Sequence, residues 1–173
     1  MSDGESMIIP LDEAHEILGT FGIGPYSRSY QRWRRDDGFR HADFEDVLNE
    51  SDFVVIIDWR EWLPDAMDVI VSQLHELGIE ASVDLDEEGE QGLFAVNGNE
   101  VKIKYSINDA DNFDQIIVSI NRLIGKTAQY RKFRSSEGSD TWAYAILKNE
   151  DWRQLEQSVS GTVRLLFANV RLE

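Results

Sequence analysis

Apolar residues recur at every third or fourth position in four stretches of the chain, residues 11–20, 64–77, 113–124 and 149–159. This spacing places the apolar side chains on one face of a helix, so each stretch predicts an amphipathic helix. Glycine favours the conformation that closes a helix, and Gly78 and Gly125 therefore predict the ends of the second and third helices.

Strand signals fill the segments between these helices. Six short segments are rich in apolar and β-branched residues, namely 53–57, 81–85, 93–96, 101–105, 127–133 and 141–147. The first is apolar throughout, which is typical of a central strand. Asn97 and Gly98 form the strongest short hairpin signal, and a two-residue turn there places Ala95 opposite Glu100.

A second hairpin is expected between the segments 127–133 and 141–147, around residues 135–140. Both hairpins require antiparallel neighbours, because their connections are too short for a crossover. We therefore predict an α+β fold, with a mainly antiparallel sheet, two or three packed helices and a helical N-terminal extension. The chain of 173 residues is expected to be a single domain, with residues 1–50 as a helical appendage and 51–173 as the α+β core. Residues 163–170 fit a helix or a strand.

Composition excludes several classes of protein. The absence of cysteine rules out disulfide scaffolds, zinc-thiolate sites and thiol redox chemistry. The N-terminal stretch is acidic where a secretory signal would be basic, and no apolar run approaches the ~20 residues that span a bilayer. We expect a soluble, cytoplasmic protein with no bound cofactor.

Charge is strongly polarised along the sequence. The chain carries 33 acidic and 17 basic residues, and residues 41–101 hold 17 of the acids against one base, Arg60. Such a balance repels nucleic acids and anionic membranes, so neither is an expected partner. Two basic clusters, within residues 28–40 and 122–134, either pack against this acid-rich segment or leave it as an exposed acidic face.

Residues 26–39 interleave tyrosine, tryptophan and phenylalanine with arginines. This composition is used to bind single-stranded nucleic acid, but it also fits an amphipathic helix with its aromatic side packed inward. The net negative charge favours the helix.

A nuclease is the alternative function. The order helix, three strands, helix over residues 65–124 and the triplet Glu100-Val101-Lys102 resemble the restriction-endonuclease-like core and its acid-x-Lys element. The resemblance implies a divalent metal held by Glu100 and a second acid such as Asp84, with Lys102 assisting the attacking water. The hairpin register leaves no acid opposite Glu100. Lys102 and Lys104 would otherwise pair with Asp84 and Asp86 across an exposed sheet face.

The acidic run of residues 84–90 does not fit a calcium loop. Counted from Asp84, the closing position of an EF-hand falls on Ala95, which has no carboxylate. No metal site is therefore expected outside the nuclease alternative, and the run is interpreted as a solvated loop.

The remaining interpretation is recognition without catalysis. We expect a non-catalytic acidic protein-binding module that docks on a basic partner, as an inhibitor or a bacterial immunity-type protein does. Tryptophans supply desolvated anchors in such interfaces, and Trp59 and Trp62 are the candidates in this chain. At least one of these two is expected to lie in the core. A homo-oligomer is also compatible with the sequence. The candidate binding residues are Trp59, Trp62, Asp84, Asp86, Glu87, Glu88 and Glu90.

Overall fold

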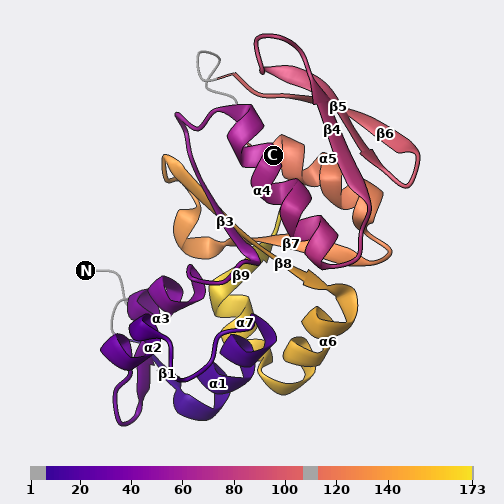
Figure 1. Cartoon of the computed structure of the whole chain (residues 1–173). Coiled ribbons are helices and arrows are strands. Elements are labelled where there is room, and N and C mark those ends of the chain that lie inside the picture. The colour runs from indigo at the N-terminus through magenta and orange to yellow at the C-terminus, as the bar shows by residue number, and fades with distance from the viewer. Residues whose placement is uncertain (1–6, 107–112, 173) are drawn as a thin grey trace. The chain divides into compact units, whose positions relative to one another are not determined.

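The computed structural model describes residues 7–106 and 113–172, which form two compact units (Figure 1). Unit 1 comprises residues 1–54 and 150–165, and unit 2 comprises residues 55–149 and 166–173. The chain therefore passes between the units three times, at 54/55, 149/150 and 165/166. The prediction of one domain with an N-terminal appendage stays a prediction.

Unit 1 is mainly helical, and its helices come from both ends of the chain. Its two short strands, β1 and β2, pair antiparallel, with Ile9 opposite Phe39. The elements are β1 (Ile8–Pro10), α1 (Leu11–Thr20), α2 (Arg28–Trp33), β2 (Gly38–Arg40), α3 (His41–Leu48), α6 (Asn149–Ser158) and α7 (Ser160–Leu166).

Aromatic side chains form much of the interior of unit 1. Phe39 contacts both Tyr30 and Phe44, with ring centroids 5.3 and 5.7 Å apart. Phe21 meets Trp152 of α6 edge to face at 6.0 Å, which joins the N-terminal helices to a C-terminal one. The expected amphipathic helix over residues 26–39 is correct only in part. Tyr30 is buried and the neighbouring arginines are exposed, but α2 ends at Trp33, Phe39 lies on strand β2 and Tyr26 is 92% exposed.

Unit 2 contains the rest of the strands. One sheet has the order β3-β8-β7-β9 and the other β4-β5-β6. The elements are β3 (Val54–Asp58), α4 (Leu63–Glu76), β4 (Ala81–Leu85), β5 (Gln91–Val96), β6 (Asn99–Lys104), α5 (Asp114–Ile124), β7 (Ala128–Phe133), the 3-10 turn η2 (Arg134–Ser136), β8 (Thr141–Lys148) and β9 (Phe167–Asn169).

Helix α5 lies between the two sheets of unit 2, since it contacts β6 on one side and β7 on the other (Figure 1). Its buried isoleucines follow the helical spacing of the sequence, with Ile116, Ile120 and Ile124 on the inner face. Helix α4 is tied to the β3-β8-β7-β9 sheet by Tyr130 of β7, whose hydroxyl donates to Gln73 at 2.7 Å. The two helices therefore share the core of unit 2 with both sheets.

The predicted α+β class is confirmed. Asn97 and Gly98 have φ of 51° and 82°, and the turn they form sets Ala95 opposite Glu100 as expected. Strands β7 and β8 pair antiparallel, as predicted for the second hairpin.

Two expectations about strands need correction. Strand β3 lies at the edge of its sheet instead of at the centre, and Ile56 is 47% exposed. A β-branched run has the same composition in either position, so the sequence did not distinguish them. Residues 163–170, for which the sequence fitted a helix or a strand, contain both, because α7 ends at Leu166 and β9 begins at Phe167.

Candidate functional site

Trp59 follows strand β3 and has a fixed backbone with an exposed ring. Its N–H donates to the carbonyl of Asp140 at 2.9 Å, and its carbonyl accepts from the hydroxyl of Tyr105 at 2.7 Å. The side chain is 41% exposed, and the guanidinium of Arg60 lies 5.2 Å from the ring centroid. The expectation that Trp59 or Trp62 belongs to the core is wrong, since Trp62 is 53% exposed.

Trp62 lies against the turn between β4 and β5, which we call the acidic turn (residues 86–90). A Cβ on Gly89 would lie 2.9 Å from the indole Nε1 of Trp62 and 2.9 Å from Cγ of Pro64. Gly89 also has φ of +68°, a conformation that favours glycine. The structure thus brings Trp62 next to the acids with which it was grouped, although they are about 25 positions apart in the sequence.

The acidic turn is held by one of its own carboxylates. Asp86 Oδ1 accepts from the backbone N–H groups of Glu90 at 3.0 Å and Gln91 at 3.4 Å. Desolvation acts to raise the pKa of Asp86, but these hydrogen bonds outweigh it and leave the pKa below its ordinary value. Glu90 is also engaged, because its Oε1 accepts from the hydroxyl of Ser106 at 3.1 Å. Asp86 and Glu90 therefore shape the turn.

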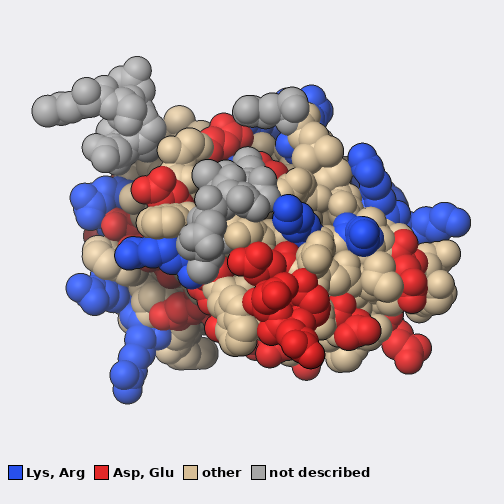
Figure 2. Space-filling view, turned by 90° about the horizontal axis from the view of Figure 1, so that it is seen from above, with Lys and Arg blue, Asp and Glu red and all other residues tan. Residues whose placement is uncertain are grey.

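The other acids of the set face solvent. Asp84, Glu87 and Glu88 are exposed, and none of the three forms an ion pair with another described residue. Figure 2 is seen from above Figure 1, and it shows a dense group of Asp and Glu side chains, with other acidic side chains scattered among Lys and Arg elsewhere on the face. Asp84, Glu87 and Glu88 therefore give unit 2 an exposed acidic surface.

Asp84 does not approach Glu100 in the way a nuclease metal site would need. Across the sheet, Asp84 is level with Leu93 and Lys102, whereas Glu100 is level with Ala95 and Ser82. The separation of two strands and two residues amounts to about 12 Å between Cα atoms. Within residues 7–106 and 113–172, no group of three His, Cys, Asp or Glu side chains is arranged to hold a metal ion.

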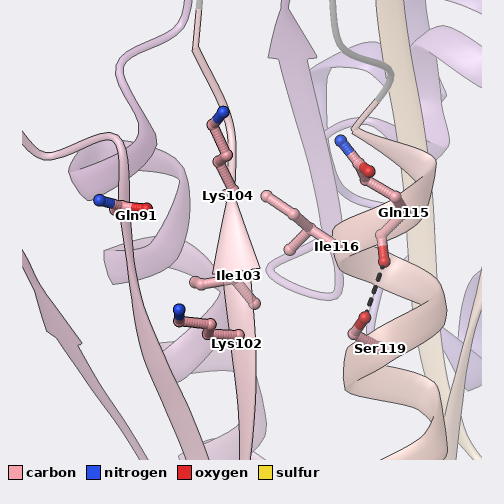
Figure 3. Close-up of a pocket in the computed structure, with 7 residues that line it drawn as sticks. All are labelled: Gln91, Lys102, Ile103, Lys104, Gln115, Ile116 and Ser119. Atoms are coloured by element: carbon pink, nitrogen blue, oxygen red, sulfur yellow. Dashed lines mark hydrogen bonds between the residues drawn. The ribbon is translucent and has the colours of Figure 1, made fainter.

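A shallow hollow of about 270 Å³ lies between β6 and α5 (Figure 3). Lys102 and Lys104 extend from β6, and Gln115 and Ser119 belong to α5, where the hydroxyl of Ser119 donates to the Gln115 carbonyl at 3.0 Å. Both lysines are exposed to solvent. The hollow offers dispersed positive charge without a buried polar group to fix a ligand.

A second charged group lies inside unit 2 and was missed by the sequence analysis. The Nζ of Lys132 is 2.9 Å from Asp114 Oδ2, and the hydroxyl of Tyr144 donates to Asp114 Oδ1 at 2.5 Å. Lys132 and Asp114 are only 8% and 9% exposed. Burial raises the pKa of the Tyr144 phenol, and the negative charge of Asp114 raises it further. The three residues come from β7, α5 and β8, so no local motif joins them.

Comparison of the chain with protein-family models, with curated proteins and with solved structures finds no match. Among the described residues, no helix is both long and apolar enough to cross a membrane. Functional inference therefore depends on the surfaces and buried groups of this chain alone.

Proposed function

We propose that the protein is a non-catalytic module that docks on a basic protein partner, as inhibitors and immunity-type proteins do. The docking surface consists of Trp59, Trp62, Asp84, Glu87 and Glu88, with Asp86 and Glu90 as the residues that shape the acidic turn. The observation that carries the proposal is the position of an exposed indole directly against an acidic turn whose outer carboxylates form no ion pair with residues 7–106 or 113–172.

Each part of this surface has a separate physical role in binding. Unpaired exposed carboxylates attract a basic protein over a Debye length of about 8 Å at physiological salt, which raises the association rate. A half-exposed tryptophan has apolar area that a partner can desolvate, and such residues dominate the energetics of protein interfaces. A second copy of the chain would bring like charges together at this surface, so a basic partner of different sequence fits better.

The partner is to be identified by crosslinking and then tested kinetically. A photoreactive phenylalanine analogue at position 62 is expected to crosslink a basic protein in extracts of the native cell, and the purified pair then allows rate measurements. We expect the association rate to fall steeply as salt rises. In Trp62→Ala the dissociation rate should rise at least about tenfold, because a central tryptophan contributes on the order of 2 kcal/mol.

Two matched double variants separate the acidic turn from overall charge. Glu87→Gln/Glu88→Gln should slow association about threefold or more, whereas Asp36→Asn/Asp37→Asn removes the same charge from another exposed pair and should have little effect. Asp86 and Glu90 are left unchanged because their replacement would disturb the turn. Equal association rates for both variants, or crosslinking of a nucleic acid or a second copy, would reject the proposal. A cytoplasmic location also stays a prediction.

A further inference from the structure

A cavity of about 500 Å³ opens beside the buried ion pair of unit 2. Its walls combine two bases, two acids, an amide and an aromatic ring, contributed by Lys132, Arg171, Asp114, Glu137, Asn169 and Trp142. This volume is within the range of small-molecule sites. The cavity is separate from the docking surface proposed above, since it shares none of its residues.

The ammonium group of Lys132 has N–H donors that are not used in hydrogen bonds to other described residues. Its ammonium donates to Asp114 and has no other hydrogen-bond partner among the described residues, although the residue is 92% buried. An ammonium group has three N–H donors, so two are available to an acceptor in the cavity. A buried polar group with unused donors is costly unless water or a ligand supplies the acceptor.

Arg171 supplies the second positive group. The residue is exposed, and it forms no hydrogen bond or ion pair with another described residue. Glu137, which also lines the cavity, is neutralised in part by Arg134, whose NH1 lies 3.9 Å from the Glu137 Oε1. Lys132 pairs with Asp114 and Glu137 pairs with Arg134, so Arg171 is the charged residue of the cavity wall that has no ion-pair partner among the described residues.

The buried ion pair of Lys132 and Asp114 is a further argument that the cavity binds a ligand. Apolar residues of similar volume often stabilise a fold as well as a buried ion pair does, because both ions lose their hydration. Charged groups at the wall of a cavity, in contrast, are typical of binding sites.

We propose that this cavity binds a small organic carboxylate that carries a flat apolar group. The carboxylate accepts from the free N–H groups of Lys132 and from the guanidinium of Arg171, and the apolar group lies against Trp142. One negative charge on the ligand complements Arg171, which has no ion-pair partner among the described residues. A phosphate dianion would add a second charge near Asp114 and Glu137, which repel it.

Phenylacetate and its neutral isostere phenylacetamide test this proposal on the whole chain. In ¹H–¹⁵N NMR spectra, the indole signal of Trp142 is assigned by its loss in Trp142→Phe. Phenylacetate should shift this signal saturably with a dissociation constant on the order of 1 mM, typical of a ligand of this size. Phenylacetamide should bind at least about tenfold more weakly, because it lacks the charge that Lys132 and Arg171 recognise.

Variants of the two bases decide between a specific site and general attraction. Arg171→Gln should weaken phenylacetate about fivefold or more, whereas Arg122→Gln, an exposed arginine outside the cavity, should leave binding unchanged. Lys132→Met should abolish binding, but it also strands the Asp114 carboxylate, so Arg171→Gln provides the test if that variant does not fold.

Three outcomes would overturn the proposal. They are the absence of a saturable shift at Trp142, equal binding by Arg171→Gln and the parent chain, and tighter binding of phenyl phosphate than of phenylacetate. The last would assign the cavity to phosphoryl groups instead of carboxylates.

Discussion

Asp86 and Asp114 show how the surroundings of a carboxylate decide its use. Asp86 lies at a turn and accepts backbone N–H groups, so its charge stabilises local structure. Asp114 is buried and accepts from a lysine and a tyrosine of two other elements, so its charge joins strands to a helix. Glu87 and Glu88 lie in the same acidic turn as Asp86 and have no such contacts within the described part of the chain, so their charge faces solvent.

Tyr144 should make stability depend on pH in the alkaline range. The pKa of Tyr144 is raised in the folded state, whereas it is about 10 in the unfolded state. Below pH 10 both states keep the proton. Above pH 10 the unfolded state loses it first, so the free energy of unfolding falls as pH rises, by about 1.4 kcal/mol per pH unit for each such tyrosine. The buried Tyr130, whose pKa is also raised, adds a similar dependence.

We expect Tyr144→Phe to remove one such contribution, so that the slope above pH 10 becomes less steep by about 1.4 kcal/mol per unit. At neutral pH the free energy of unfolding of the same variant should be lower by about 2 kcal/mol, because the hydrogen bond from Tyr144 to the charged Asp114 carboxylate disappears. Urea unfolding between pH 8 and 11.5 measures both effects. Tyr26→Phe is the control, since Tyr26 is 92% exposed, and a slope identical in the two variants would contradict the assignment.

At the scale of the element, the turn of the β5–β6 hairpin gives a prediction that depends on backbone conformation alone. A Cβ on Gly98 would meet nothing within 4 Å, but its φ of +82° disfavours a β-branched residue. Gly98→Val should therefore destabilise the chain by more than ~1 kcal/mol, measured by chemical denaturation. Asn97→Gly keeps the turn accessible and should change stability by less than about 0.5 kcal/mol. An unchanged midpoint for Gly98→Val would show that the turn is different in solution.

Elements with strong local signals were predictable from the sequence. Helices α1, α4 and α5 follow the 3.6-residue spacing, and the Asn97-Gly98 turn fixed the register of β5 and β6. The two strands β1 and β2 have three residues each, too few for any periodicity to emerge. Their pairing is a tertiary contact between segments about 30 positions apart, which local patterns do not contain.

The sequence identified the acidic residues of the candidate site, but it did not show which structural contacts each of them makes. Residue type identified the acids of the β4–β5 turn, yet the role of Asp86 depends on backbone N–H groups whose direction only the folded turn sets. The pair of Lys132 and Asp114 depends on the packing of β7 against α5, so nothing in the spacing of the two residues pointed to it. Charge counts locate an acidic face; they do not locate a buried pair.

At the scale of the whole molecule, the division into two units predicts unequal responses to core substitutions. Trp152 is 1% exposed and contacts Phe21 within unit 1. Trp152→Ala should cost about 4 kcal/mol, since it removes a large buried side chain. Hydrogen exchange should then speed up first in α1 and α3, while β7 and β8 keep their protection. Equal acceleration in both units would show that they unfold as one, and the exposed Trp62→Ala is the control.

The three passages of the chain between the units have a consequence for synthesis. Residues 7–54 are translated before unit 2, but α6 and α7, which belong to the same unit as residues 7–54, are translated only after nearly the whole of unit 2. Until then the side of Phe21 that Trp152 covers has no partner, and the nascent chain exposes apolar surface of the kind that chaperones bind. Unit 1 therefore begins to be made before unit 2 and is completed after most of unit 2 has been translated.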